Sequence, residues 1–224
     1  MCRDQADIIF SLDSSGSINE EKINWPTILQ FISDVVSDPG LNVGRNTVRV
    51  GVVIYSQTAN VEISLSDQGS ISYVDYLKSR INRLGYVGST SNIADGIEKA
   101  RNEFRANSPS GRRKILVLMT DGKANERESE TLSQAQDAKN EGVYIITVGV
   151  TGRIDAGQLR LIATDPKNFI QVNTFDELTT ILKPLVESAC TTGGKWCRRP
   201  IYSRFGSSAN RRVDVARIPL SGAR

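Results

Sequence analysis

The chain has 224 residues, a formal net charge of +3 and no histidine. The lack of histidine excludes His-based catalytic triads, His-ligated zinc sites and imidazole pH sensors. Apolar residues make up 39% of the chain without forming a run of about 18, so the composition is typical of a globular protein and predicts no membrane span.

The first predicted element is a buried strand over Asp7–Asp13, which continues into the run Asp13-Ser14-Ser15-Gly16-Ser17. One carboxylate and several hydroxyls therefore follow directly at the carboxyl end of a strand. Hard oxygen donors of this kind suit Mg²⁺, Ca²⁺ or Mn²⁺. Taken alone, the same run is also an ordinary turn or helix N-cap sequence.

Helical and strand patterns then alternate along the chain. Apolar spacing predicts helices, and runs rich in Val and Ile predict strands. The segment Asn60–Leu65 alternates apolar and polar residues, which indicates a half-exposed antiparallel edge strand. In chain order the elements are helix Glu20–Val36, strands Thr47–Tyr55 and Asn60–Leu65, helices Ile71–Leu84 and Asn92–Phe104, strand Lys114–Thr120, helix Glu128–Asn140, strand Val143–Val150, helix Asp155–Ala163, strand Asn168–Val172 and helix Phe175–Ser188.

This order predicts the fold class. Strands that alternate with helices form a mainly parallel sheet covered by helices on both faces. We therefore expect an α/β, Rossmann-like three-layer sandwich, with a mainly parallel six-stranded sheet and one antiparallel edge strand.

Two further segments carry oxygen ligands. The strand Lys114–Thr120 is followed by Asp121-Gly122, and a hydroxyl-rich loop, Gly88-Ser89-Thr90-Ser91, precedes a predicted helix. Open α/β sheets bind ligands at the carboxyl edge of their strands. We therefore expect the two strand-end aspartates to converge at that edge.

Three cysteines, Cys2, Cys190 and Cys197, flank the α/β pattern. A Cys2–Cys190 disulfide would join the two ends of the domain and would indicate an oxidising, extracellular setting. The alternative is three free thiols in a cytosolic protein. For Cys197, a free thiol, an interchain disulfide and a partner outside this sequence all stay open. No signal peptide is visible, so any export signal was removed or never included.

Charge and composition change near residue 190. Residues 191–224 carry eight Lys or Arg and one Asp, a net charge of +7, so the first 190 residues sum to −4. We predict one domain over 1–190. Residues 191–224 then form a basic segment, either a disordered tail or the start of a truncated following module.

Three separated motifs together resemble the von Willebrand factor type A domain, also called the integrin I-like domain, over about residues 5–190. The family's first motif, Asp-x-Ser-x-Ser, matches Asp13, Ser15 and Ser17. The aspartate of its strand-Thr-Asp-Gly motif matches Asp121. The resemblance implies that these residues form a metal-ion-dependent adhesion site.

The family's remaining ligand is a threonine five residues before a small residue and six before an aliphatic one. Counting back from Gly96 and Ile97 gives Ser91, with Thr90 as the rival ligand. Serine keeps the hydroxyl and lacks the methyl group that restricts the threonine rotamer.

The resemblance implies an extracellular adhesion module of the kind found in matrilins and collagen-associated proteins. The cofactor would be a divalent cation, Mg²⁺ first, with Mn²⁺ or Ca²⁺ as alternatives. The partner would be an extracellular protein with an exposed acidic residue, collagen or another matrix protein among the candidates. We predict a secreted matrix protein that is not an enzyme and has no nucleic-acid partner.

Two other functions compete with this one. A structural A domain without functional metal binding is the first. The second is a metal-dependent phosphatase of the haloacid dehalogenase type, which needs a second carboxylate two residues after its strand-end aspartate. Ser15 occupies that position, and no phosphate-binding Gly-Lys-Ser/Thr motif occurs.

Overall fold

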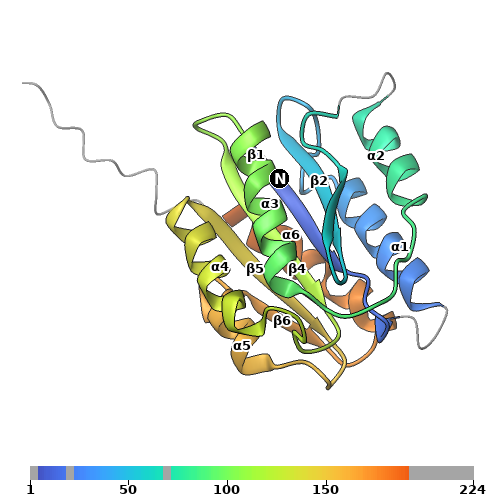
Figure 1. Cartoon of the computed structure of the whole chain (residues 1–224). Coiled ribbons are helices and arrows are strands. Elements are labelled where there is room, and N and C mark those ends of the chain that lie inside the picture. The colour runs from blue at the N-terminus through green and yellow to red at the C-terminus, as the bar shows by residue number, and fades with distance from the viewer. Residues whose placement is uncertain (1–4, 19–22, 68–71, 192–224) are drawn as a thin grey trace, which may run out of the picture. The chain divides into compact units, whose positions relative to one another are not determined.

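The computed structural model describes residues 5–18, 23–67 and 72–191. Within these residues one sheet has the strand order β3-β2-β1-β4-β5-β6 (Figure 1). Only the β2–β3 pair in this sheet is antiparallel, which confirms the predicted mainly parallel six-stranded sheet with an antiparallel edge. The strands are β1 (Ala6–Asp13), β2 (Val48–Tyr55), β3 (Ala59–Ile63), β4 (Arg113–Thr120), β5 (Val143–Val150) and β6 (Phe169–Val172).

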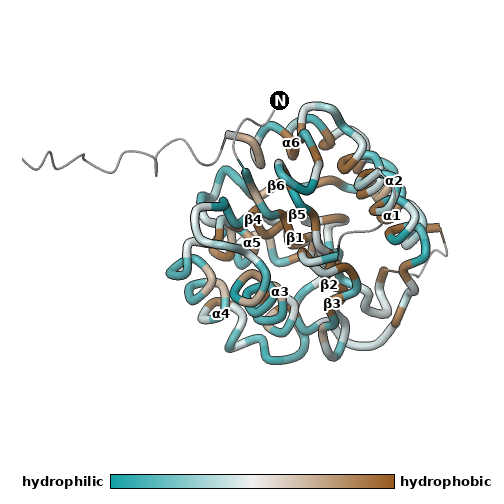
Figure 2. Tube along the Cα trace, turned by 90° about the horizontal axis from the view of Figure 1, so that it is seen from above, coloured by the Kyte–Doolittle hydropathy of each residue, from teal (hydrophilic) through white to brown (hydrophobic). Residues whose placement is uncertain are grey.

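Helices cover both faces of the sheet, as predicted. One core cluster joins α1, α2 and α6 to the sheet, and a second joins α3, α4 and α5 to the other face. Figure 2 shows mostly hydrophobic residues in the central strands, surrounded by helices in which hydrophilic and hydrophobic residues alternate. The helices are α1 (Asn24–Ser37), α2 (Tyr73–Ile81), α3 (Ile93–Asn107), α4 (Glu128–Asn140), α5 (Ala156–Ile162) and α6 (Leu182–Thr191), with short 3-10 segments η2 (Pro166–Asn168) and η3 (Asp176–Ile181).

The last predicted helix, Phe175–Ser188, was wrong as a single helix. The structure divides this segment into the 3-10 segment η3 and the α-helix α6. Pro184 has no N–H to donate to the carbonyl of Thr180, and in a continuous helix its ring would clash with that carbonyl. Because α6 begins at Leu182, Pro184 lies in its first turn, where proline is tolerated.

The sheet register places the predicted ligands at one edge. Asp13 at the end of β1 pairs with Tyr55 at the end of β2, and Leu12 pairs with Met119 of β4. The carboxyl ends of β1 and β4 are therefore level. Asp121, which follows β4, is brought beside Asp13 by the backbone alone.

A close contact fixes α3 against the same strands. A Cβ atom on Gly96 would lie 2.6 Å from Tyr55 Cδ1 and 2.9 Å from Ser11 Oγ. Only glycine allows this approach. The start of α3, and with it Ser91, is held close to the end of β1.

The opposite edge of the sheet holds a buried ion-pair network. Asp7 of β1 is fully buried and accepts hydrogen bonds from Arg49, Ser108 and Arg112 at 2.6–2.8 Å. Burial raises the pKa of Asp7, but these hydrogen bonds outweigh it and hold the pKa below its ordinary value. The network joins β1, β2 and the α3–β4 loop far from the predicted ligands.

The ends of the domain are only partly described. Cys190 in α6 is disulfide-bonded, whereas Cys2 and Cys197 lie outside the described residues. The Cys2–Cys190 pairing and the basic segment 191–224 therefore stay predictions. Among the described residues no helix is both long and apolar enough to cross a membrane.

Candidate metal-binding site

The loop after β1 gathers its side chains around Asp13. Asp13 is 1% exposed, and its Oδ1 accepts a hydrogen bond from the backbone N–H of Ser15 at 2.9 Å. This short turn brings Ser15 Oγ to 3.2 Å from Ser17 Oγ. The alternate residues of the first motif thus present a carboxylate and two hydroxyls on one side of the loop.

The loop after β4 joins the same group. Ser17 Oγ donates to Asp121 Oδ1 at 2.7 Å, and Thr120 Oγ1 donates to Asp13 Oδ2 at 2.7 Å. The structure therefore brings together the two strand-end aspartates, which are more than a hundred residues apart in sequence.

Ser91 reaches the group from the loop before α3. Its Oγ donates to Asp13 Oδ2 at 2.8 Å, and its backbone N–H donates to Asn125 Oδ1 at 2.6 Å. The hydroxyl of Thr90 is buried and has no hydrogen-bond partner among the described residues. Of the two rival residues, Ser91 is therefore the one in hydrogen-bond contact with Asp13.

Backbone hydrogen bonds fasten the Ser91 loop to the loop after β1. The N–H of Gly88 donates to the carbonyl of Ser14 at 2.9 Å, and the N–H of Gly16 donates to that of Ser89 at 2.8 Å. Ser89 has φ of 122°, a strained conformation for a residue with a side chain. The surrounding backbone hydrogen bonds stabilise this strained conformation, so the positions of the two loops are fixed before any ligand binds.

The two carboxyl groups are electrostatically unfavourable on their own. Burial raises the pKa of Asp13, although hydrogen bonds from Ser15, Thr120 and Ser91 oppose the shift. The pKa of Asp121 is raised to about 6, mainly by burial and in part by the nearby charge of Asp13, whereas the Ser17 hydrogen bond and the charge of Arg153 lower it. A cation between them would favour the ionised form of both groups.

The residues fit a hard divalent cation. Asp121 Oδ2 is buried and has no hydrogen-bond partner among the described residues, so one carboxylate oxygen is available for a ligand. The other donors in the group are hydroxyl oxygens. The described residues contain no cluster of three or more His, Cys, Asp or Glu, so hydroxyls would have to supply most of the ligands.

Sequence reasoning missed three residues around this group. Thr120 was noted only as part of a motif, and Asn125 and Arg153 were not predicted. Arg153 Nη2 lies 3.8 Å from Asp121 Oδ2. Nothing in the sequence distinguished Asn125 from other polar loop residues or Arg153 from other arginines.

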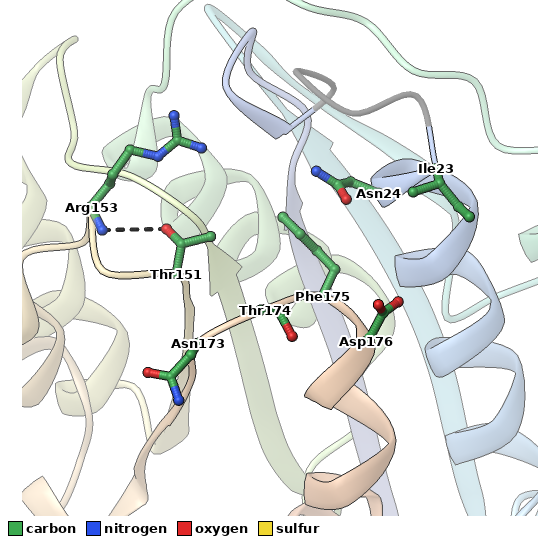
Figure 3. A pocket seen from close by; sticks show the side chains of 8 residues that line it. All are labelled: Ile23, Asn24, Thr151, Arg153, Asn173, Thr174, Phe175 and Asp176. Atoms are coloured by element: carbon green, nitrogen blue, oxygen red, sulfur yellow. Dashed lines mark hydrogen bonds between the residues drawn. The ribbon is translucent and has the colours of Figure 1, made fainter.

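A pocket of about 270 Å³ lies at the same edge of the sheet (Figure 3). It is formed where the start of α1 meets the loops that follow β5 and β6. Arg153 connects it to Asp121. The lining residues are Ile23, Asn24, Thr151, Arg153, Asn173, Thr174, Phe175 and Asp176.

Comparison with known proteins gives one consistent picture. Residues 7–184 match the family described as the von Willebrand factor type A domain. The mouse (Mus musculus) collagen alpha-6(VI) chain is 27% identical over 196 residues, which cover 86% of this chain and 8% of that protein. Mouse matrilin-1 is 28% identical over 221 residues, which cover 92% of this chain and 42% of its own length.

A solved structure agrees with these relatives. Proximal thread matrix protein 1 from the mussel byssus, described with a zinc-occupied MIDAS motif, superposes with a TM-score of 0.76 and 31% identity. The superposition covers 84% of this chain and 49% of that one. The chain thus spans less than half the length of each of these three proteins.

Proposed function

The chain belongs to the von Willebrand factor type A domain family, and on that premise we propose that it is an extracellular adhesion module that binds a protein partner through a divalent cation. The cation ligands are Asp13, Ser15, Ser17, Ser91 and Asp121, which act directly or through water. Mg²⁺ is the first candidate, and Mn²⁺ and Ca²⁺ are alternatives.

One observation carries this proposal: two buried carboxylates and three hydroxyls converge, and Asp121 Oδ2 lacks a hydrogen-bond partner among the described residues. Two carboxylates bring a formal charge of −2, and the hydroxyls are neutral donors. A divalent cation held this way keeps Lewis acidity and can accept one more oxygen ligand. An acidic side chain of a partner protein suits that position.

The relatives support the proposed setting. They are named as a collagen chain, a matrilin and a byssus thread matrix protein. We therefore place this chain among secreted matrix proteins and its partner among matrix proteins that present an acidic residue, collagen included. The Cys2–Cys190 disulfide belongs to this proposal, and an interchain disulfide through Cys197 stays open.

Calorimetric titration of Mg²⁺ and Mn²⁺ into metal-stripped protein tests the cation site. We expect saturable binding in the native protein, loss of binding in Asp13→Ala, and native affinity in Asp75→Ala. Asp75 is an exposed carboxylate on α2 and provides the matched control. If Asp13→Ala binds the cation as tightly as Asp75→Ala and the native protein do, the cation binds at a site other than the one proposed.

The partner is tested by solid-phase binding to purified matrix proteins, fibrillar collagen among them. Capture should require Mg²⁺ and should be lost with a chelator and in Asp121→Ala. Capture that survives both treatments would show that another surface makes the contact.

A structural A domain without a cation is the alternative that one observation favours. Asp13 is already hydrogen-bonded by Ser15, Ser91 and Thr120, so most of the group is satisfied without a metal. If neither cation binds to the native protein, the domain acts as a scaffold.

A further inference from the structure

Arg153 forms an ion pair with Asp121 of the candidate cation site. Its side chain is 50% exposed, whereas Asp121 is fully buried, and Nη2 lies 3.8 Å from Asp121 Oδ2. That oxygen has no hydrogen-bond partner among the described residues. Arg153 is therefore a positive group at the mouth of the site, facing the carboxylate oxygen that a cation would use.

The backbone fixes Arg153 in this place. Thr151 has φ of 73°, which is unusual for a β-branched residue. Its N–H donates to the carbonyl of Val172 at 2.9 Å, and its Oγ1 donates to the carbonyl of Asp121 at 3.1 Å. The N–H of Arg153 then donates to Thr151 Oγ1 at 3.3 Å. The loop that carries Arg153 is thus attached to Asp121 itself.

Arg153 also lines the pocket beside the site. Figure 3 shows Arg153 on one wall and Asp176 on the opposite wall. Most of the other lining groups are polar, among them Asn24 and Asn173. The pocket therefore has a positive charge on the Arg153 wall and a negative charge on the Asp176 wall.

Resting on the proposed cation site, we propose that Arg153 is the second anchor for the partner, and that the partner presents two carboxylates a few bonds apart. Without a cation, Arg153 offsets the charge of Asp121. With a cation bound, Asp121 is neutralised, and the guanidinium, next to a positive ion, binds the second carboxylate. The planar guanidinium fork matches a carboxylate in a way that an ammonium group does not.

The first arm of the test measures cation binding alone. Mg²⁺ is titrated into native protein, Arg153→Gln, Arg153→Lys and Lys167→Gln. Removing a positive charge next to the cation should tighten Mg²⁺ binding about three- to tenfold in Arg153→Gln. Arg153→Lys keeps the charge and should bind like the native protein. Lys167→Gln removes an exposed charge in η2, which precedes β6 at the amino-terminal edge of the sheet, away from the site. This control should also bind Mg²⁺ like the native protein.

The second arm measures, by NMR titration at saturating Mg²⁺, the affinities of the protein for two probes, glutarate and its monoamide, glutaramate. The two probes have equal length and differ by one carboxylate. Native protein should bind glutarate about tenfold more tightly than glutaramate, which corresponds to about 1.4 kcal/mol. Arg153→Gln should lose this preference, and Arg153→Lys should keep only part of it.

Each outcome separates the two proposals. If native protein binds Mg²⁺ but Arg153→Gln changes neither Mg²⁺ affinity nor the glutarate preference, the role of Arg153 is overturned and the cation site stands. If native protein binds no Mg²⁺, the proposed function fails and this inference fails with it.

Discussion

At the scale of single residues, the candidate site brings together two buried carboxyl groups whose ionised forms are unfavourable without a cation. Asp13 and Asp121 are both buried, and burial raises the pKa of each. In a protein without a cation, their negative charge opposes folding at neutral pH. A bound divalent cation reverses this sign, because it favours the ionised form of both.

The first prediction concerns Asp121→Asn. Asparagine keeps the shape and removes the charge, so the metal-stripped variant should be more stable than native protein at neutral pH, by about 1–3 kcal/mol at most. The same variant should lose the rise in melting temperature that Mg²⁺ produces. Differential scanning calorimetry with Mg²⁺ and with chelator measures both. A variant that is destabilised in chelator and still responds to Mg²⁺ would contradict this prediction.

The second prediction separates Ser91 from Thr90. Ser91→Ala removes a proposed cation ligand and a hydrogen bond to Asp13, so Mg²⁺ affinity should fall about tenfold, or about 1.4 kcal/mol. Thr90→Val removes a buried hydroxyl that has no partner among the described residues, and should change the affinity less than about twofold. Calorimetric titration of the two variants decides between them, and the opposite ranking would make Thr90 the ligand.

At the scale of elements, the two edges of the sheet have different roles. The carboxyl ends of β1 and β4 hold the candidate ligands. The amino end of β1 holds Asp7, paired with Arg49 and Arg112. The buried ion pairs and the proposed cation site therefore lie at opposite ends of the same strand, so we expect that substitutions can change stability without changing cation binding.

The third prediction follows from Asp7. Asp7→Asn leaves two largely buried arginines without their partner and should cost roughly 3 kcal/mol near neutral pH. The folded pKa of Asp7 is lowered, so its stabilising effect is present above about pH 4 and is lost as pH falls through the folded pKa. Urea unfolding of the native protein and of Asp7→Asn should therefore show a difference in the free energy of unfolding that becomes smaller toward about pH 2. Mg²⁺ affinity should not change. A stability difference that grows in acid would mean that the Asp7 pKa is raised by folding, not lowered.

At the scale of the whole molecule, the described part of the chain is one sheet whose site loops are fastened before any ligand binds. The Ser14–Gly16 turn and the Gly88–Ser89 turn are joined by backbone hydrogen bonds. The predicted Cys2–Cys190 bond would add a covalent link between the two ends of this domain.

The fourth prediction is that this bond stabilises the domain. Closing so long a loop contributes up to about 5 kcal/mol on the chain-entropy model. Peptide mapping of the unreduced protein should identify a Cys2–Cys190 peptide, and mild reduction should lower the melting temperature without changing Mg²⁺ affinity. A Cys190–Cys197 peptide in its place would show that the domain ends are not linked.

Local patterns in the sequence predicted most of the fold. Buried runs such as Val143–Val150 identified the parallel strands, and the alternation in Asn60–Leu65 identified the antiparallel edge. Pro184 was overlooked as a helix boundary, although its missing N–H divides the last helix. This was a local signal, and the sequence contained it.

The candidate site was predicted only as far as motif spacing reaches. Asp13 and Asp121 follow from their places at strand ends, whereas Ser91 was chosen over Thr90 only by the motif spacing that the family resemblance implies. Asn125 and Arg153 act through contacts that depend on how separate loops meet, and no periodicity or spacing encodes those contacts. The pocket beside Arg153 is likewise formed by the start of α1 and the loops after β5 and β6, segments that are separated in sequence.

The most direct test of the central claim is to locate the cation. Crystals of the protein grown with Mn²⁺ should show one strong anomalous peak at the carboxyl ends of β1 and β4, at coordination distances of roughly 2 Å from the hydroxyls of Ser15 and Ser17. The peak should be absent in Asp13→Ala crystals. A peak elsewhere, or none in native crystals at saturating Mn²⁺, would contradict the cation site and leave a scaffold domain.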